Sequence, residues 1–245
     1  MLDRNRLKMR VLAAFLALPL FATPAAAQDW NNLAASEAMN QVHATMRQHM
    51  IVNPAEEGEN GARGTPPAPA RMDATYRVDP NVRRTVQQKL VAAVTRQNEA
   101  AGEELSATFA RHDLIAMGDR ALSSFGLRSG DVIDAVTIYR LAMWGAAKGL
   151  TTPPPRSAIT GARMQTASTF DLAAARLDTP ARRQEFAETL LYQAILMDLA
   201  SEQAQKSRDQ VTIDALGRSA RQALVASGLN PDRMQLTSRG FILER

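Results

Sequence analysis

The segment TLLYQAILMDLA, residues 189–200, decides the fold class of this chain. Its side chains are apolar on nearly every side of a helix, and Gln193 and Asp198 are the main interruptions. A helix that is apolar all round is surrounded by other helices rather than lying on a surface. The segment therefore predicts an inner helix of an all-α bundle, which begins at Thr179-Pro180 and runs to about Gln203.

Further helices are predicted outward from this segment, within one domain over residues 73–245. Asp79 can cap the first of them, and Pro80 suits its first turn because a missing N–H costs nothing there. Helical patterns also cover residues 103–125, 131–148, 156–175 and 210–226. The prediction is a compact bundle of five or six helices. Residues 234–243 alternate loosely, and we expect an extended tail across the bundle, with a short strand as the alternative.

Three glycines mark helix ends. Gly126, Gly149 and Gly228 each follow a helical pattern and each precede a leucine. Glycine can take the left-handed conformation that ends a helix, and the next apolar residue can pack back on the last turn. Three such endings in one chain favour a helical bundle.

The N-terminus has the order of a secretory signal peptide. Four basic residues, Arg4, Arg6, Lys8 and Arg10, precede an apolar run over residues 11–22, and small residues follow up to Ala27. The apolar run is well short of the ~20 residues that a transmembrane helix needs. We expect residues 1–27 to be cleaved, which leaves a periplasmic or secreted protein without a stable membrane span. An uncleaved anchor is the alternative.

Composition excludes several classes of site. The leader holds four of the 29 Lys and Arg residues and one of the 25 Asp and Glu residues, so its removal lowers the formal net charge from +4 to +1. That balance argues against a nucleic-acid partner, and neither Arg83-Arg84 nor Arg182-Arg183 is interleaved with aromatic residues. The absence of cysteine excludes disulfides, thiolate metal sites and cysteine nucleophiles.

A helical arm and a linker are predicted between the leader and the domain. Residues 28–50 carry an amphipathic stripe that includes Met39, Val42 and Met46. Residues 51–72 are dense in Pro, Gly, Glu and Asn without apolar periodicity, which is typical of a disordered linker. Met39, Met46 and Met50 give this stripe flexible side chains that adapt to a partner groove, so Met39, Val42 and Met46 are candidate contacts for a protein partner. The alternative is that the arm folds back on its own domain.

The inner helices carry the other candidate binding residues. Arg140 follows Tyr139 on one predicted helix, and it is a candidate partner for Gln193 or Asp198 on another. An unpaired buried polar group costs about 1–3 kcal/mol, and an unpaired charge costs more. We therefore hypothesise a small polar pocket, and a purely structural network is the alternative. The members of this pocket are Tyr139, Arg140, Trp144, Tyr192 and Asp198.

No pattern of a known catalytic or metal site occurs in the sequence. Asp113, Asp119, Asp131 and Asp134 lie close along the chain, but paired carboxylates for glycoside hydrolysis must face each other across about 5–10 Å. Asp131 and Asp134 also suit a helix N-terminus, where negative charge meets the helix dipole. The histidines lack H-E-x-x-H spacing, and neither a G-x-S-x-G elbow nor a phosphate-binding glycine loop occurs. No cofactor or metal is therefore expected.

A further set of residues, which read as helix stops and packing positions, is spread from Tyr76 to Phe241. They are Tyr76-Arg77, Asp113-Leu114, Gly118, Arg120-Ala121-Leu122, Phe125-Gly126-Leu127, Asp131, Asp134-Ala135, Tyr139, Trp144, Leu236-Thr237 and Gly240-Phe241. The pattern resembles that of an uncharacterised family of exported bacterial proteins, domain of unknown function 6683, over residues 74–243. The resemblance supports a single domain over residues 73–245 and implies no activity, cofactor or catalytic residue.

Two functions remain open from the sequence. The first is that of an exported, noncatalytic helical module that binds another protein or supports envelope assembly. The absent catalytic motifs, the methionine-rich arm and the balanced charge favour it. The alternative is a periplasmic enzyme that acts on an envelope polymer or small molecule through an unrecognised polar site. The only residues that could form such a site are Arg140, Asp198 and the carboxylates within residues 113–134. Partner identity and oligomeric state do not follow from the sequence.

Overall fold

The computed structural model describes residues 43, 44, 46, 47 and 73–243. The predicted leader over residues 1–27, the predicted linker over residues 51–72 and the rest of the predicted arm lie outside the described residues, and so do Met39 and Val42. Residues 43, 44, 46 and 47 are helical, as predicted for the arm.

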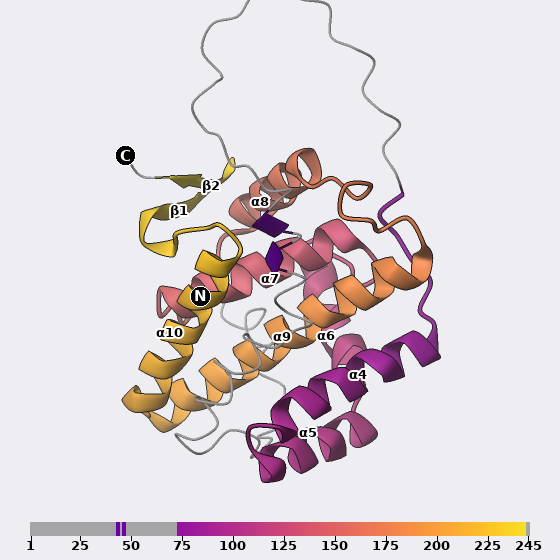
Figure 1. Cartoon of the computed structure of the whole chain (residues 1–245). Helices are drawn as coiled ribbons and strands as arrows, with labels where there is room; N and C mark the ends of the chain where they lie inside the picture. The colour runs from indigo at the N-terminus through magenta and orange to yellow at the C-terminus, as the bar shows by residue number, and fades with distance from the viewer. Residues whose placement is uncertain (1–42, 45, 48–72, 244–245) are drawn as a thin grey trace, which may run out of the picture.

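Seven α-helices and a two-stranded hairpin make up the part of the domain within residues 73–243 (Figure 1). The predicted all-α class is confirmed. The elements are α4 (Pro80–Thr95), α5 (Glu99–Arg111), α6 (Leu114–Ser124), α7 (Val132–Ala147), α8 (Arg156–Thr169), α9 (Pro180–Ser207), α10 (Gln210–Ala226), a 3₁₀ turn (Pro231–Arg233), β1 (Met234–Thr237) and β2 (Gly240–Leu243). None of these described helices is long and apolar enough to cross a membrane.

Helices α7 and α9 form the centre of the bundle. Residues 132–140 of α7 and residues 186–194 of α9 are all buried, which confirms α9 as an inner helix. Helices α4, α6 and α10 pack against α9, while α8 and α10 pack against α7, and α5 packs on the outside of α4 (Figure 1). Leu190 and Leu191 are fully buried, and each such side chain contributes about 2 kcal/mol of hydrophobic free energy.

The three predicted glycine endings are confirmed. Gly126, Gly149 and Gly228 have φ angles of +79°, +64° and +82°, which lie in the left-handed region. The leucine after each glycine donates its N–H back to the last turn of the helix, at 3.0 Å from Leu127 to the Leu122 carbonyl and at 2.9 Å from Leu229 to the Leu224 carbonyl. These are the hydrogen bonds of a Schellman ending.

Two predicted helices are shorter in the structure, because an aspartate in each caps a new helix or turn. The prediction of one helix over residues 103–125 is wrong: His112 is extended, and the Asp113 side chain accepts from the Ala116 N–H to cap a new helix, α6. The helix expected to reach residue 175 ends at Thr169, because Asp171 Oδ1 accepts from the next backbone N–H groups, those of Ala173 and Ala174, and forms a separate turn.

The C-terminal residues form a hairpin rather than the extended tail that the sequence predicted. Strands β1 and β2 pair antiparallel, with Leu236 opposite Phe241 and Thr237 opposite Gly240. A lone strand is marginal in water, but two strands that pair and lie on a helix satisfy each other's backbone groups. The helix that covers this hairpin is α8.

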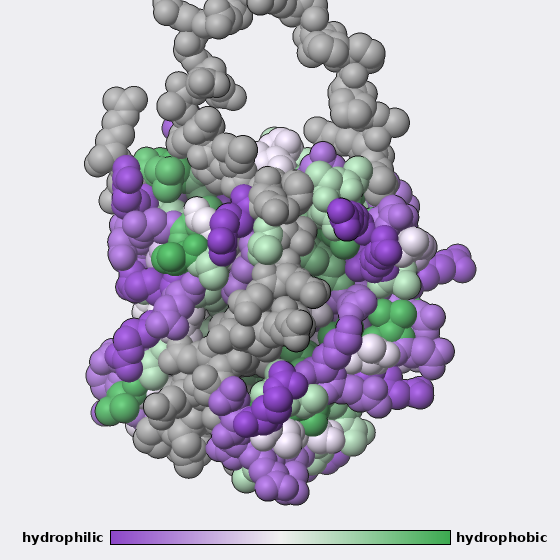
Figure 2. All heavy atoms as spheres, in the orientation of Figure 1, coloured by the Kyte–Doolittle hydropathy of each residue, from purple (hydrophilic) through white to green (hydrophobic). Residues whose placement is uncertain are grey.

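The surface is largely hydrophilic on the face in Figure 2, where hydrophobic side chains of the described residues form small separate groups. Large exposed apolar residues are scattered over several elements: Val78, Leu150, Met164, Val211 and Val225. Single exposed apolar residues are normal for a folded domain, so binding surfaces have to be sought where the structure is hollowed or where polar groups lack partners.

Candidate functional site

The five residues of the predicted polar pocket lie on the two central helices but divide among separate environments. Tyr139, Arg140 and Trp144 are on α7, whereas Tyr192 and Asp198 are on α9. The expected pairing of Arg140 with Gln193 or Asp198 is not formed. All three guanidinium nitrogens lack a hydrogen-bond partner among the described residues, and so does Gln193 Nε2.

Arg140 and Trp144 lie together under the C-terminal hairpin. Arg140 is 1% exposed, and its guanidinium carbon is 5.0 Å from the centroid of the Phe241 ring on β2. Trp144, one turn later, meets the same ring edge-on at 5.9 Å, and its Nε1 donates to the Met234 carbonyl at 3.3 Å. A desolvated cation over an aromatic face gains about 2 kcal/mol, so Phe241 offsets part of the cost of burying Arg140.

Helix α8 holds this hairpin in place through one glutamine and one glycine. Gln165 Nε2 donates to the Phe241 carbonyl at 2.7 Å, and Gln165 Oε1 accepts from the Phe241 N–H at 2.9 Å. A Cβ atom at Gly161 would lie 2.2 Å from the carbonyl oxygen of Ser238, so the hairpin turn approaches α8 more closely than any side chain allows. Both contacts fix Phe241 above Arg140.

Tyr139 contacts the described residues of the N-terminal arm. Its buried hydroxyl is hydrogen-bonded with His43 Nε2 at 2.9 Å, and Met46 is fully buried. Arg47 Nε donates at 2.9 Å to the carbonyl of Ala226, at the C-terminus of α10, where the helix dipole favours a cation. These arm residues therefore pack on the domain of their own chain.

His43 is neutral at pH 7. Its burial, and to a smaller extent the charge of Arg47, lowers its pKa to about 4. A neutral imidazole exchanges one hydrogen bond with the Tyr139 hydroxyl and carries no charge into the interior. The contact between the arm and the domain is therefore at full strength at neutral pH, where His43 carries no charge.

Tyr192 faces away from this site and belongs to the contact between α4, α5 and α9. Gln87 Nε2 donates to its hydroxyl at 2.8 Å, and the Phe109 ring centroid lies 5.0 Å from its own. Burial is the main cause that raises the pKa of Tyr192 to about 12. The phenol stays protonated at neutral pH and serves as a hydrogen-bond acceptor.

A ladder of polar contacts joins α4 to α9. Each pair in it is separated by 105 residues along the chain, so the two helices run parallel in a fixed register. We call this set the polar ladder: Asp79–Gln184, Arg83–Glu188 and Gln87–Tyr192. Successive members on each helix are four residues apart, which places them on one ridge of that helix.

The central pair of the polar ladder is charged. Arg83 donates to Glu188 Oε1 from Nη2 at 2.7 Å and from Nε at 3.1 Å, and its Nη1 donates to Asp113 Oδ2 at 2.8 Å. Gln184 Nε2 adds a hydrogen bond to the same glutamate oxygen at 3.1 Å. Glu188 is fully buried, and its second oxygen has no partner among the described residues. Such a pair depends strongly on both members being present.

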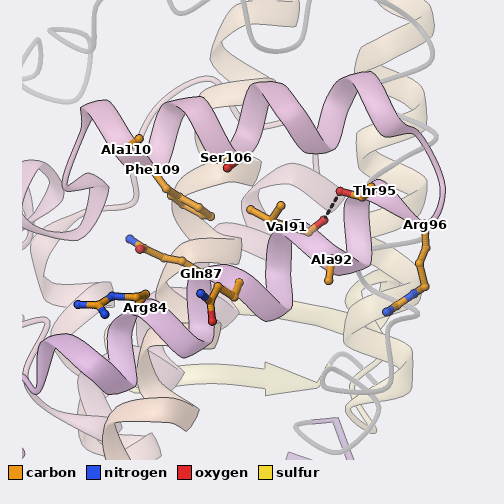
Figure 3. A pocket seen from close by; sticks show the side chains of 10 residues that line it. Arg84, Gln87, Val91, Ala92, Thr95, Arg96, Ser106, Phe109 and Ala110 are labelled. Atoms are coloured by element: carbon orange, nitrogen blue, oxygen red, sulfur yellow. Dashed lines mark hydrogen bonds between the residues drawn. The ribbon is translucent and has the colours of Figure 1, made fainter.

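An open groove of about 540 Å³ runs between α4 and α5, beside the polar ladder (Figure 3). Its walls include Gln87 and Val91 from α4 and Phe109 from α5, whose ring points toward α4. Arg84 and Arg96 lie near its two ends, and none of its lining residues is acidic. The two helices touch near Gly102, where a Cβ would lie 2.0 Å from Thr95 Oγ1.

The carboxylates between residues 113 and 134 have structural partners. Asp113 and Asp131 cap α6 and α7, and Asp119 Oδ1 accepts from the Ser129 N–H at 3.1 Å. Asp134 is fully buried and accepts from the Arg128 N–H at 2.9 Å and from the Arg163 side chain. Burial raises the pKa of Asp134, and Arg163 opposes that rise. The helix-start role expected for Asp131 is confirmed.

Asp198 stands apart from the other predicted site residues. Its side chain keeps exposed surface and has no hydrogen-bond or ion-pair partner among the described residues. Even so, partial burial raises the pKa of Asp198 to about 6, and the negative charge of Glu202 adds to the rise. Within residues 73–243 and the four described arm residues, no group of three His, Asp or Glu could hold a metal ion.

Sequence reasoning missed Glu188, Gln87 and Phe241. The first two have a signal that could have been found, because polar residues recur at four-residue spacing on both helices of the polar ladder. Phe241 is one of the packing positions in the family pattern, but its place over Arg140 depends on how the hairpin docks and does not follow from the sequence.

The comparisons with known proteins give one match. No curated protein and no solved structure matches the chain. A family model matches residues 6–244, which include most of the predicted leader, the arm and the linker as well as nearly all of the helical domain. The resemblance found from the sequence is therefore confirmed. The chain belongs to DUF6683, a family of unknown function.

Proposed function

We propose that this chain is an exported, noncatalytic protein-binding module whose groove between α4 and α5 holds an amphipathic, acidic segment of a partner protein. The observation that carries the proposal is the groove itself, with apolar walls and an arginine near each end. An apolar groove that receives the apolar face of a helix is a recurring mode of peptide recognition.

The charges around the groove define the partner segment. Arg84 and Arg96 are exposed and have no ion-pair partner among the described residues. Arg84 is on α4 and Arg96 is its C-cap, twelve positions later, which corresponds to about 18 Å along a helix axis. A partner segment with carboxylates at this separation would pair with both, while its apolar side chains enter the space beside Val91 and Phe109. The occupant that fits best is a helix of three to four turns, roughly, with acidic ends.

The use made of the buried polar groups also supports binding rather than catalysis. The carboxylates of Asp113, Asp119 and Asp131 each accept backbone hydrogen bonds at loops or helix starts, and Glu188 is held by Arg83. A general acid and base need access to a substrate. No specific contact in the described domain favours the alternative of a periplasmic enzyme.

Export is part of the proposal and rests on the leader over residues 1–27. Protein recovered from the periplasm or medium should begin at Gln28, which mass spectrometry of the intact chain would show. Recovery of the uncleaved chain from the cytoplasm would contradict it.

The groove is tested by placing a photo-cross-linking residue at Gln88, which is exposed and lines it, in the full-length chain. Val211 on α10, also exposed, is the matched control position. Cross-linked peptides are then sequenced by mass spectrometry. The expected result is a partner segment with an apolar stripe and several carboxylates, obtained from position 88 and lost in the double variant Arg84→Glu/Arg96→Glu.

Two outcomes would contradict the groove as the binding face. One is equal cross-linking from positions 88 and 211. The other is a cross-linked segment without carboxylates, or one that still binds the charge-reversed variant. Arg156→Glu, a change of an exposed arginine at the start of α8, is the control for charge reversal in general.

A further inference from the structure

Arg140 presents a separate problem, which the proposed groove does not involve. Its guanidinium is buried, and none of its three nitrogens has a hydrogen-bond partner among the described residues. Buried arginines are normally paired, because removing a charge from water without a counter-charge is costly. The described residues around Arg140 therefore supply no acceptor for its guanidinium.

No charged side chain compensates Arg140 from the elements packed around it. Burial is the one cause that lowers its pKa, to about 10, and no acidic group counters that effect. The guanidinium remains protonated at neutral pH. Aromatic rings lie beside it: the Phe241 ring lies over the guanidinium, and Trp144 packs against that ring in a T-shaped arrangement.

The aromatic rings beside Arg140 and the single charge of its guanidinium indicate which chemical group would serve as its acceptor. A planar guanidinium matches a carboxylate in bidentate geometry. One guanidinium neutralises one negative charge, so a phosphate dianion would keep an uncompensated charge in this apolar place. The rings of Phe241 and Trp144 favour an apolar or aromatic body attached to that carboxylate.

Access to Arg140 requires the hairpin to move. Phe241 belongs to β2, near the end of the chain, and the hairpin is held mainly by α8 through Gln165 and the close approach at Gly161. Trp144 adds one long hydrogen bond of 3.3 Å to Met234. The hairpin also buries Met234 and Phe241, but a unit of two four-residue strands can open locally at a lower cost than unfolding of the whole bundle.

We infer that Arg140 is the recognition residue of a binding site for a small apolar carboxylate, with the C-terminal hairpin as its cover. The ligand carboxylate binds the guanidinium, and the ligand body takes the place of the Phe241 ring beside Trp144. Binding is noncovalent, and it transfers no proton or group.

The test uses the full-length mature chain and benzoate as the probe, with affinity measured by calorimetry. Benzamide has the same shape without the charge, and sulfate has charge without the apolar body. We expect benzoate to bind, and benzamide and sulfate to bind at least ~10-fold more weakly. Arg140→Met should weaken benzoate binding at least ~10-fold, while Arg156→Met, an exposed arginine on α8, should leave it unchanged.

Two more variants keep the test decisive. Arg140→Lys retains the charge but loses the planar fork, so its affinity should fall between those of the wild type and Arg140→Met. Phe241→Ala opens the cover, so it should bind benzoate at least as tightly as the wild type. Equal binding by the wild type and Arg140→Met, equal binding of benzoate and benzamide, or no benzoate binding by either the wild type or Phe241→Ala would overturn the inference.

Discussion

Two regions of this molecule bury an arginine in opposite ways. In the polar ladder, Arg83 is enclosed between α4 and α9 with Glu188 and Asp113 as its partners. Under the C-terminal hairpin, Arg140 is more deeply buried and has no acceptor among the described residues. The first arginine fixes the register of two helices. The guanidinium of the second contributes no hydrogen bond to the described fold, so its presence points to an acceptor that the described residues do not supply.

A third buried group, His43, shows how a charge can be avoided. Burial lowers its pKa to about 4, so the imidazole enters the interior uncharged and bonds to Tyr139. Pairing at Arg83 and neutrality at His43 both avoid an uncompensated buried charge, although Glu188 Oε2 and His43 Nδ1 have no partner among the described residues. Arg140 has neither, because it has no counter-charge in the described structure and stays protonated at neutral pH.

The largest effect is expected when the paired arginine loses its buried partner. Glu188→Ala leaves Arg83 with Asp113 as its only counter-charge and removes an acceptor from Gln184. We expect a loss of about 3 kcal/mol in the free energy of unfolding, measured with urea. The double variant Arg83→Met/Glu188→Met should recover most of that loss. Equal stability of the single variant and the wild type would show that the Arg83–Glu188 pair does not stabilise the fold.

Displacing the C-terminal hairpin that covers Arg140 should have the second-largest effect on the free energy of unfolding. Gly161→Ala forces a Cβ against the Ser238 carbonyl, so the hairpin must shift away from α8, at a cost of about 2 kcal/mol. The shift of the hairpin should change the fluorescence of Trp144. The other tryptophan of the chain, Trp30, is replaced by phenylalanine so that Trp144 alone is observed. Gly145→Ala is the matched control, because no neighbouring atom lies within 4 Å of a Cβ there. Identical spectra for both variants would argue against a close contact at Gly161.

Acid should release the arm through His43. Its folded pKa of about 4 lies below the ordinary value of 6.5, so the detached state binds a proton first as the pH falls. The contact is at full strength above pH 6.5 and weakens between pH 6.5 and 4, by at most about 2 kcal/mol at pH 5. Proteolysis within residues 28–50 should accelerate over that window.

The variant His43→Gln isolates this effect. Asp198, whose pKa is raised to about 6, acts in the opposite sense in the same window, but it is present in both proteins. The wild type should therefore lose protection on acidification by more than His43→Gln does. The same pH profile in both would mean that His43 does not control the arm.

The smallest effect is expected at an exposed pair between the same two helices as the polar ladder. Lys89 and Glu185 are about half exposed and form a salt bridge between α4 and α9. Lys89→Met should change the free energy of unfolding by less than ~0.5 kcal/mol, because water screens such pairs. A loss as large as that of Glu188→Ala would show that burial is not what gives the polar ladder its strength.

Local features of this fold could be predicted from the sequence. The endings at Gly126, Gly149 and Gly228 depend on two or three adjacent residues, and so does the cap at Asp79. The inner position of α9 followed from apolar residues on every side of one segment. The break at His112 was missed because Asp113 reads equally well as a polar residue on the surface of a longer helix.

Features that depend on distant contacts could not be predicted in the same way. The partners in the polar ladder are 105 residues apart, so their meeting depends on how α4 and α9 pack. The five predicted pocket residues share two helices but face different neighbours, and helix periodicity does not specify which neighbour covers which face. The hairpin that covers Arg140 is made of strands too short to be recognised from alternation alone.

Whether Arg140 lacks a partner in the ligand-free protein can be measured as the free energy of unfolding of Arg140→Met, compared with that of the wild type in urea at low salt and without added carboxylates. Replacing an unpaired buried cation with an apolar side chain of similar length should stabilise the ligand-free protein by about 2 kcal/mol. A loss of stability of similar size would contradict the account, because it would mean that Arg140 has a partner that holds the fold together.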